Sequence, residues 1–285
     1  MIVLLWLLLP VGLILVVGLG LSFYLTHRFD RTKIDNPAEY HLDYVDVAFP
    51  TPDGLTLVGW WIPAPNSERA VIILHGHGGC MDWDVHRAPT FHAAGFNVLL
   101  FDFRAHGRSP GQLATFGYLE RQDVLGAVEF LKSRGIKRIG VLGFSYGGMA
   151  SMLAASICPD VHAVVTDGGP IRLRTAIAAR AVELHLPLWL AGPLAWLTVA
   201  ITSLRLGVNL FHYEPVRWVG KISPRPILFI HGDLDLYCPD IDDLYRAAGE
   251  PKELWRLPGV GHTEASKIFP EEFYRRVIGF FNEYI

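Results

Sequence analysis

Three residues have the types that nucleophilic acyl transfer needs. Ser145 lies in "VLGFSYGGMA" (141–150), Asp235 in "ILFIHGDLDLYCP" (227–239) and His262 in "LPGVGHTEA" (257–265). A serine hydroxyl is a weak nucleophile until a histidine takes its proton and a carboxylate orients that histidine. The sequence therefore predicts Ser145 as nucleophile, His262 as base and Asp235 as the orienting acid.

The glycines around Ser145 indicate a sharp turn between a strand and a helix. An apolar run, Ile139 to Phe144, precedes the serine, and a helical pattern begins near Gly147. Only small residues fit two positions before and two after the residue at such a turn, which explains Gly143 and Gly147. The turn would lift the Ser145 hydroxyl above the carboxyl edge of a sheet, where ligands bind in open α/β folds.

Acyl transfer also needs hydrogen-bond donors for the oxyanion of the tetrahedral intermediate. The amide of Tyr146, the residue after the nucleophile, is the first candidate. The loop "ILHGHGG" (73–79) follows an earlier apolar run, and its glycines let the backbone turn toward a substrate. The amide of His77 is the predicted second donor.

Other polar residues are expected to be structural. Asp167, at the end of "HAVVTDGG" (162–169), competes with Asp235 for the acid role, because an acid there can reach the same histidine. The remaining candidates are more simply explained as residues that hold a loop in place or lie in the core. They are His75, His106, His231, Asp102 and Arg104. The spacing of His, Cys, Asp and Glu predicts no metal site.

The elements that must position these residues alternate between strands and helices. Five continuous apolar runs are typical of strands buried on both faces of a parallel sheet: residues 70–76, 97–103, 138–144, 162–169 and 225–232. A β-hairpin is expected around "PTPDG" (50–54). Helical patterns cover about 83–94, 119–134, 147–157, 240–248 and 270–284. The pattern predicts an α/β fold with a mostly parallel central sheet flanked by helices.

One interval is too long for a simple crossover between strands. Residues 170–224 are apolar and helical in pattern, and Leu186 to Leu204 carries no charge. A second transmembrane helix is disfavoured by Pro187 and Pro193 and because both ends return to one sheet. The interval is expected to be a helical insertion whose apolar faces line an acyl pocket and contact a membrane.

The N-terminal segment predicts a membrane anchor. Residues 2–25 contain no charge, and a helix of that length is about 30 to 36 Å long, enough to cross a bilayer. A cleaved signal peptide is disfavoured by the long apolar run and the missing basic n-region. The expected organisation is an anchor at 1–26, a linker at 27–42 and a catalytic domain at 43–285. Arg28, Arg31 and Lys33 after the span favour a cytoplasmic catalytic domain.

Composition narrows the function classes. The 285-residue chain has a formal net charge of −3 and no basic patch, which argues against a nucleic-acid partner. Three dispersed cysteines, Cys80, Cys158 and Cys238, are typical of buried apolar positions rather than of a disulfide framework. No cofactor and no obligate protein partner are indicated. The expected partners are a small acyl substrate, including lipids, and the membrane.

From about Tyr44 onward the chain resembles the α/β-hydrolase superfamily. Four motifs match in order: "HGHGG", "DFRAHGRS", "GFSYGG" and the pair "HGDLDLYCP" and "GVGHTE". The resemblance implies a cap between strands six and seven, and it assigns the acid to Asp235 as the last carboxylate of an HGxxD motif. The overall pattern is most similar to membrane-anchored enzymes of the monoacylglycerol-lipase and serine-aminopeptidase-like group. Ala105 and His106 replace the glycine and aromatic residue that are usual in the second motif.

The function expected from the sequence is hydrolysis of a carboxylic ester with an apolar acyl chain, through a covalent acyl-enzyme. Thioester or amide hydrolysis by the same mechanism is the alternative, as is a non-catalytic membrane binding module, since a fold by itself does not give activity. An epoxide or haloacid hydrolase is disfavoured because those enzymes need a carboxylate where this chain has Ser145.

Overall fold

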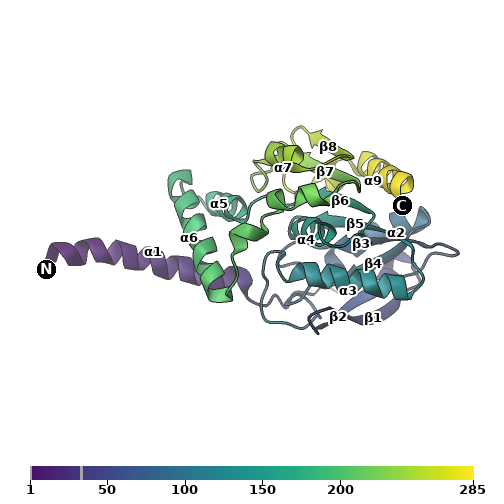
Figure 1. Cartoon of the computed structure of the whole chain (residues 1–285), viewed down its shortest axis with the longest axis horizontal. Helices are drawn as coiled ribbons and strands as arrows, with labels where there is room; N and C mark the ends of the chain where they lie inside the picture. Colours follow the sequence, from purple (N-terminus) through teal and green to yellow (C-terminus); the bar gives the residue numbers. More distant parts are fainter. Residues whose placement is uncertain (1, 33–34) are drawn as a thin grey trace.

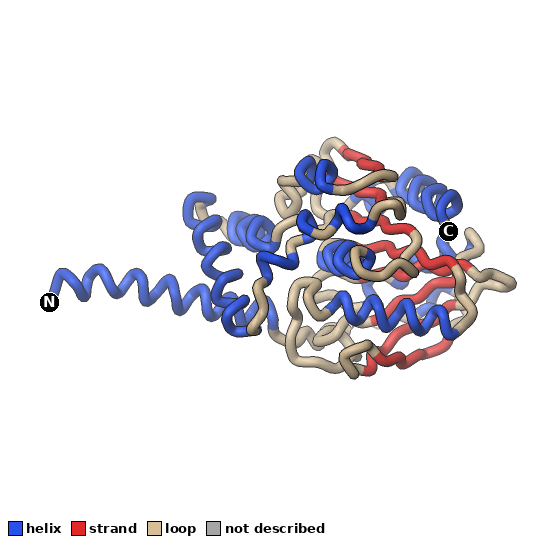
Figure 2. Tube along the Cα trace, in the orientation of Figure 1, coloured by secondary structure: helices blue, strands red, loops and turns tan. Residues whose placement is uncertain are grey.

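Eight strands form one twisted sheet at the centre of the molecule (Figures 1 and 2). The computed structural model describes residues 2–32 and 35–285, with side chains from residue 12 onward. Met1 and Lys33, which belong to the expected anchor and its basic flank, lie outside the described residues. The strand order is β1-β2-β4-β3-β5-β6-β7-β8.

The sheet is parallel except at one edge, as predicted. Its strands are β1 (Val45–Pro50), β2 (Thr56–Ile62), β3 (Arg69–Leu74), β4 (Asn97–Phe101), β5 (Arg138–Phe144), β6 (Ala163–Asp167), β7 (Ile227–Gly232) and β8 (Lys252–Leu257). β1 and β2 form the expected antiparallel hairpin, and β2 also runs antiparallel to β4. The remaining neighbours are parallel, so their carboxyl ends meet at one edge.

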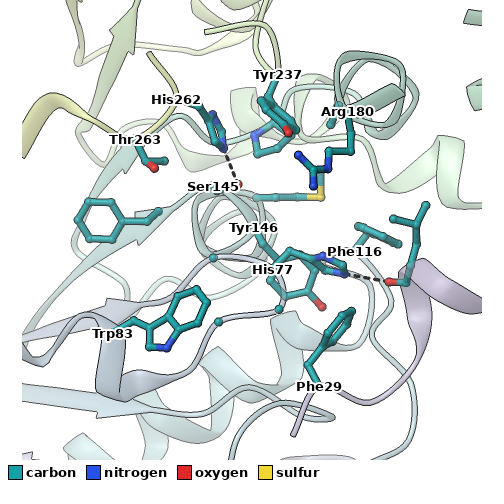
Figure 3. Close-up of a pocket in the computed structure, with 18 of the residues that line it drawn as sticks. Phe29, His77, Trp83, Phe116, Ser145, Tyr146, Arg180, Tyr237, His262 and Thr263 are labelled. Atoms are coloured by element: carbon teal, nitrogen blue, oxygen red, sulfur yellow. Dashed lines mark hydrogen bonds between the residues drawn. The ribbon is translucent and has the colours of Figure 1, made fainter. Parts of the chain in front are cut away.

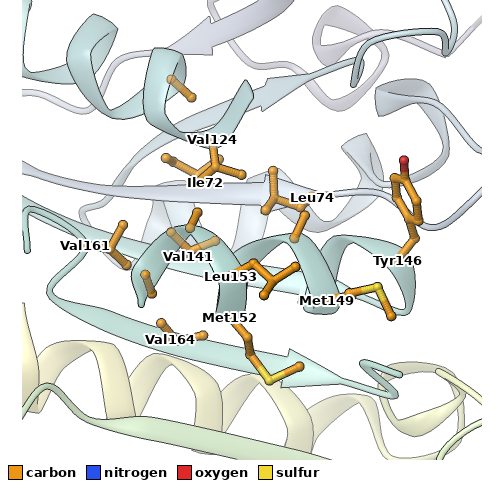
Figure 4. Packing of buried hydrophobic residues seen from close by; sticks show 14 of the residues in the cluster. Ile72, Leu74, Val124, Val141, Tyr146, Met149, Met152, Leu153, Val161 and Val164 are labelled. Carbon is orange, nitrogen blue, oxygen red and sulfur yellow. The ribbon is translucent and has the colours of Figure 1, made fainter. Parts of the chain in front are cut away.

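Helices cover both faces of the sheet because the strand residues alternate between two apolar cores. The helices are α2 (Ala88–Ala93), α3 (Glu120–Ser133), α4 (Tyr146–Ala155), α7 (Ile241–Ala247), α8 (Ala265–Ile268) and α9 (Pro270–Tyr284). On β3, Ile72 packs toward α3 and α4, whereas Val71 and Ile73 pack toward α2 and α9. Figure 4 shows the first core, with Leu153 of α4 close to Val141 of β5. Two-sided burial explains the continuous apolar runs in the sequence.

A helical insertion separates β6 from β7, where a cap was predicted. It contains α5 (Leu173–Glu183) and α6 (Leu188–Leu206), followed by short 3-10 turns that end at Ile222. Pro187 lies at the N-cap of α6, and Pro193 lies inside its first turns. Large side chains on the insertion remain exposed, with Leu188 and Trp189 each at 73% and Trp196 at 55%.

The N-terminal helix α1 (Ile2–Thr26) projects from the body of the molecule, and α6 packs across its C-terminal half (Figure 1). Gly18, Ser22 and Thr26 form a buried stripe of small residues on α1. The Thr202 hydroxyl of α6 donates a hydrogen bond of 2.9 Å to the Ser22 hydroxyl. Such spacing lets two helix backbones approach closely.

Among the helices whose side chains the structure describes, α6 alone is long and apolar enough to cross a membrane. Within its most apolar window, 28% of the helix is buried inside the molecule. The described apolar part of α1 is Gly12–Thr26, which is shorter than a bilayer-spanning helix. The structure therefore does not show the N-terminal anchor, which stays a proposal.

The chain that follows α1 is packed onto the α/β domain from its first residues. Phe29 donates a backbone hydrogen bond of 2.7 Å to Ala105 and accepts one of 2.9 Å from Gly107. The Arg28 guanidinium donates to the backbone carbonyls of Ser109 and Gly111. The segment expected as a linker thus begins with residues held in fixed contacts.

Candidate active site

Ser145 lies at the sharp turn between β5 and α4, in a backbone conformation with φ 50° and ψ −115°. A positive φ is uncommon for a residue other than glycine and marks a strained position. The flanking glycines explain how the turn is tolerated. A Cβ atom on Gly143 would lie 2.4 Å from the Gly147 carbonyl oxygen, and one on Gly147 would lie 2.4 Å from that of Leu74. Backbone contacts this close exclude any side chain at either position.

The three residues predicted for acyl transfer lie in one hydrogen-bonded chain. His262 Nε2 is 2.8 Å from Ser145 Oγ (Figure 3). His262 Nδ1 is 2.9 Å from each carboxylate oxygen of Asp235. The Asp235 side chain is almost fully buried and also accepts a bond of 2.8 Å from the Tyr237 amide. With Nδ1–H donated to a carboxylate, Nε2 is left free to accept the serine proton.

Asp167, the competing acid, ends β6 on the same edge but is not part of this chain. Among the described residues, none hydrogen-bonds to its Oδ2 atom, and His262 bonds to Asp235 instead. Burial raises the pKa of Asp167 to about 7. Next to it, a Cβ atom on Gly168 would lie 2.9 Å from His262 Nδ1, so a glycine is needed for the histidine to fit.

The loop after β3 carries the His77 amide and the turn after β5 carries the Tyr146 amide, and both lie at the same edge of the sheet. Gly76 lies beside the nucleophile, because a Cβ atom placed on it would be 3.6 Å from Ser145 Cβ. Within the described part of the chain, neither amide donates a hydrogen bond to a protein acceptor. Two amides next to the nucleophile with no internal partner fit the donors that a developing oxyanion requires.

Two histidines hold this loop in place. His106 Nε2 accepts a bond of 3.1 Å from the Gly78 amide, and its Nδ1–H donates to the Arg104 carbonyl. His75 Nε2 accepts from the Phe103 amide, and its Nδ1–H donates to the Gly76 carbonyl. Burial lowers the pKa of His106 well below its usual range, which keeps Nε2 available as an acceptor.

The rest of the "DFRAHGRS" loop is also held by internal contacts. The Asp102 carboxylate accepts from the amides of Met81 and Arg108, at 2.7 and 2.8 Å. Arg104 forms ion pairs with Asp123 and Asp53, at 2.6 and 2.7 Å. These contacts connect loops to one another and leave neither side chain directed at the cavity.

One group of side chains has metal-ligand chemistry within the described residues: Asp235, Cys238 and His262, whose ligand atoms lie within 4.8 Å of one another. Asp235 and His262 are already bonded to each other, and the Cys238 thiol donates to the Gly168 carbonyl at 3.1 Å. Burial raises the pKa of the Cys238 thiol well above its usual range, which disfavours the thiolate that a metal would need. The hydrogen bonds alone account for this group.

A cavity of about 630 Å³ opens above Ser145. Its walls come from the loops at the sheet edge, from α5 of the cap and from the end of α1, and they are mostly apolar: Tyr24, Leu25, Phe29, Trp83, Phe116, Phe144, Met149, Leu173 and Ile177. Four charged residues also line it, namely Arg31, Asp84, Arg87 and Arg180. The contribution of α1 was not expected from the sequence. The small-residue stripe on α1 was the one signal that this helix packs against another.

Comparison with known proteins supports the assignment of the fold. Residues 69–192 match the family described as the alpha/beta hydrolase fold. A protein from Mycobacterium tuberculosis, Rv2307c, is 30% identical over 226 residues, which cover 77% of this chain and 72% of the relative. The polyketide transferase grgF from a Penicillium species is 30% identical over 266 residues, covering 77% and 89%.

The chain belongs to the α/β-hydrolase superfamily. Its structure is similar to that of the esterase Pf2001 from Pyrococcus furiosus, with a TM-score of 0.74, 29% identity, and coverage of 89% of this chain and 98% of the esterase. GrgF from Penicillium has a TM-score of 0.68 and 26% identity, covering 85% and 99%. The fold of this α/β-hydrolase is thus shared with an esterase over most of the chain, whereas α1 precedes the matched family region.

Proposed function

We propose that this α/β-hydrolase is a membrane-anchored serine hydrolase that cleaves a carboxylic ester with an apolar acyl chain. The observation that carries the proposal is the bonded chain of Ser145, His262 and Asp235 at the base of an apolar cavity. The similarity to an esterase supports ester chemistry. Placement in the monoacylglycerol-lipase and serine-aminopeptidase-like group is part of the same proposal.

The proposed reaction proceeds through an acyl-enzyme. The Ser145 oxygen attacks the ester carbonyl carbon while His262 Nε2 takes the serine proton. The amides of His77 and Tyr146 stabilise the oxyanion, and His262 returns the proton to the alcohol as the C–O bond breaks. Water then attacks the acyl-enzyme, giving its proton to His262, and Ser145 leaves with that proton restored. No step requires a cofactor.

The apolar acyl group is inferred from the cavity and from the surface around it. Cavity walls of Phe, Leu, Ile and Met side chains favour burial of a hydrocarbon chain. Exposed apolar side chains also lie on α1 and α6, including Phe23, Tyr24 and Trp196. Apolar surface of this extent is typical of a membrane or protein contact. A substrate held at the bilayer fits both features, with the catalytic domain on the cytoplasmic side.

Thioester and amide hydrolysis are alternatives within the same chemistry. The similarity to a polyketide transferase favours one further candidate, transfer of the acyl group to an acceptor other than water. Product analysis with and without an added alcohol distinguishes transfer from hydrolysis. A non-catalytic binding module at the membrane is the alternative outside enzymes.

The test is labelling of isolated membranes with a fluorescent fluorophosphonate, using the wild type and Ser145→Ala. An activated serine reacts with this probe whatever its natural substrate. We expect a labelled band in the wild type that is absent from Ser145→Ala and stays with the membrane pellet after alkaline carbonate extraction. A folded wild type without labelling would favour the binding module, and a labelled band in the extract would contradict the anchor.

A further inference from the structure

The C-terminal end of α1 is held by donors from the catalytic domain. The last carbonyls of a helix have no partner within the helix and must find one elsewhere. In α1, the Leu25 carbonyl accepts a bond of 2.8 Å from His77 Nε2, and the Thr26 carbonyl accepts one of 3.0 Å from the Ala114 amide. A helix that served only as a tether would leave these carbonyls to water.

The cap reaches the same end of the helix. The Arg205 guanidinium of α6 donates to the Ser22 carbonyl at 3.1 Å and to the hydroxyls of Ser22 and Thr26. The Arg205 guanidinium also lies over the Phe23 ring. The loop after β3 (residues 75–79), which carries the His77 amide, is called the oxyanion loop below. This loop, the loop that contains Ala114, and the cap are thus all joined to one turn of α1.

The His77 side chain is the contact between this turn and the oxyanion loop (Figure 3). A carbonyl oxygen only accepts, so the imidazole must carry its proton on Nε2. Burial lowers the pKa of His77 to about 4, so the ring is neutral at pH 7. The rings of Phe116 and Phe29 pack on it with centroids at 5.2 and 4.6 Å. Between these two apolar rings, the hydrogen bond to the Leu25 carbonyl fixes the position of the His77 ring.

We infer that His77 is a positioning residue, whose ring ties the oxyanion loop to the end of α1 and thereby directs the His77 amide toward the substrate carbonyl. The inference rests on the proposed function. It makes α1 part of the active site as well as a membrane anchor. Leu25 and Tyr24 also line the cavity above Ser145, so the same turn forms one of its walls.

The test compares three substitutions in the full-length protein, assayed in detergent with a p-nitrophenyl ester. His77→Gln places an amide N–H near the position of Nε2 and can still reach the Leu25 carbonyl. His77→Asn is the matched control, because it is one methylene shorter and cannot reach. His77→Phe keeps the ring packing but has no donor. The backbone amide is present in all three.

We expect kcat to fall about tenfold to a hundredfold in His77→Asn and His77→Phe, with KM changed by less than about twofold. His77→Gln should recover kcat to within about threefold of wild type. The amplitude of the p-nitrophenol burst counts intact sites, so it separates a slow site from an unfolded one. Equal values of kcat for Gln and Asn, or a wild-type kcat for Phe, would overturn the inference.

The proposed function is judged separately in this experiment. A wild type that neither hydrolyses the ester nor reacts with the fluorophosphonate contradicts the serine-hydrolase proposal itself. A reactive wild type with no difference among the three variants contradicts only the role of His77.

Discussion

The carboxyl edge of the sheet and the α1–α6 helix pair are both tightly packed, but by different means. At the edge, a Cβ atom on Gly147 would lie 2.4 Å from the backbone oxygen of Leu74, so that nothing larger than hydrogen fits. Between the helices, a Cβ atom placed on Gly18 would lie 2.9 Å from the tip of the Ile201 side chain. A backbone cannot move aside, whereas a side-chain tip can. Substitutions at the sheet edge should therefore either leave activity almost intact or abolish it. Substitutions between the helices should change activity by degrees.

The sharpest test of the first region uses its two buried carboxylates. Asp235→Asn should lower kcat by about 10³- to 10⁴-fold, because an amide facing His262 Nδ1 favours the wrong tautomer. Asp167→Asn should lower kcat by less than about tenfold, because His262 bonds to Asp235 alone of the two. The measurement is kcat with a p-nitrophenyl ester at pH 7.5, with thermal unfolding as the check on folding. Equal losses in the two variants would mean that either acid can serve His262.

The first region could be predicted from the sequence because its geometry is local. The turn at Ser145 needs a glycine two residues away on each side, and both glycines lie within the five-residue segment 143–147. The ends of parallel strands meet at one edge, so Asp235, His77 and His262 could be assigned to the site from strand positions. The sequence could not show which of the two acids bonds to His262, because that depends on how the loops after different strands pack together.

The second region could not be predicted because its contacts join distant residues. The hydrogen bond between Ser22 and Thr202 spans 180 positions, and the one between Leu25 and His77 spans 52. An uncharged helix also predicts a membrane anchor from the sequence, whichever part of the protein it packs against. The apolar composition predicts a helix and says nothing of its buried face, and α1 was for this reason expected to be separated from the catalytic domain by a linker.

The next prediction concerns the charge state of Asp167. Burial raises its pKa from the ordinary value of 3.8 to about 7, although Arg87 and His262 oppose the shift. Between these pH values the folded state keeps a proton that the unfolded state has released. This contribution to stability is complete below pH 3.8 and is lost as pH rises through about 7.

Asp167→Asn removes this titration and keeps a neutral side chain of similar shape. From pH 5 to pH 8 the free energy of unfolding of the variant should therefore gain about 2 to 3 kcal/mol relative to wild type. Urea unfolding at both pH values measures the change, with the exposed Asp43→Asn as the control. A constant difference between variant and wild type would mean that Asp167 is ionised at the edge throughout this range.

The smallest expected effect comes from the helix pair, and it uses two glycines of the same helix. Gly18→Leu places a side chain against Ile201 and Leu197 of α6, whereas a Cβ atom on Gly20 has no neighbour within 4 Å. Because α6 can shift, Gly18→Leu should loosen the cap without unfolding the domain. We expect KM for long-chain esters to rise about three- to tenfold, with short-chain esters changed by less than about twofold.

Gly20→Leu should leave KM unchanged for every chain length, since it adds apolar surface only on the exposed side of α1. A p-nitrophenyl ester series from C4 to C16, measured for both full-length variants in the same detergent, gives the comparison. Equal KM values for the two variants would mean that the α1–α6 contact does not shape the acyl pocket. Loss of folding in Gly18→Leu alone would mean that the helix pair is as rigid as the sheet edge, and the contrast between the two regions would no longer hold.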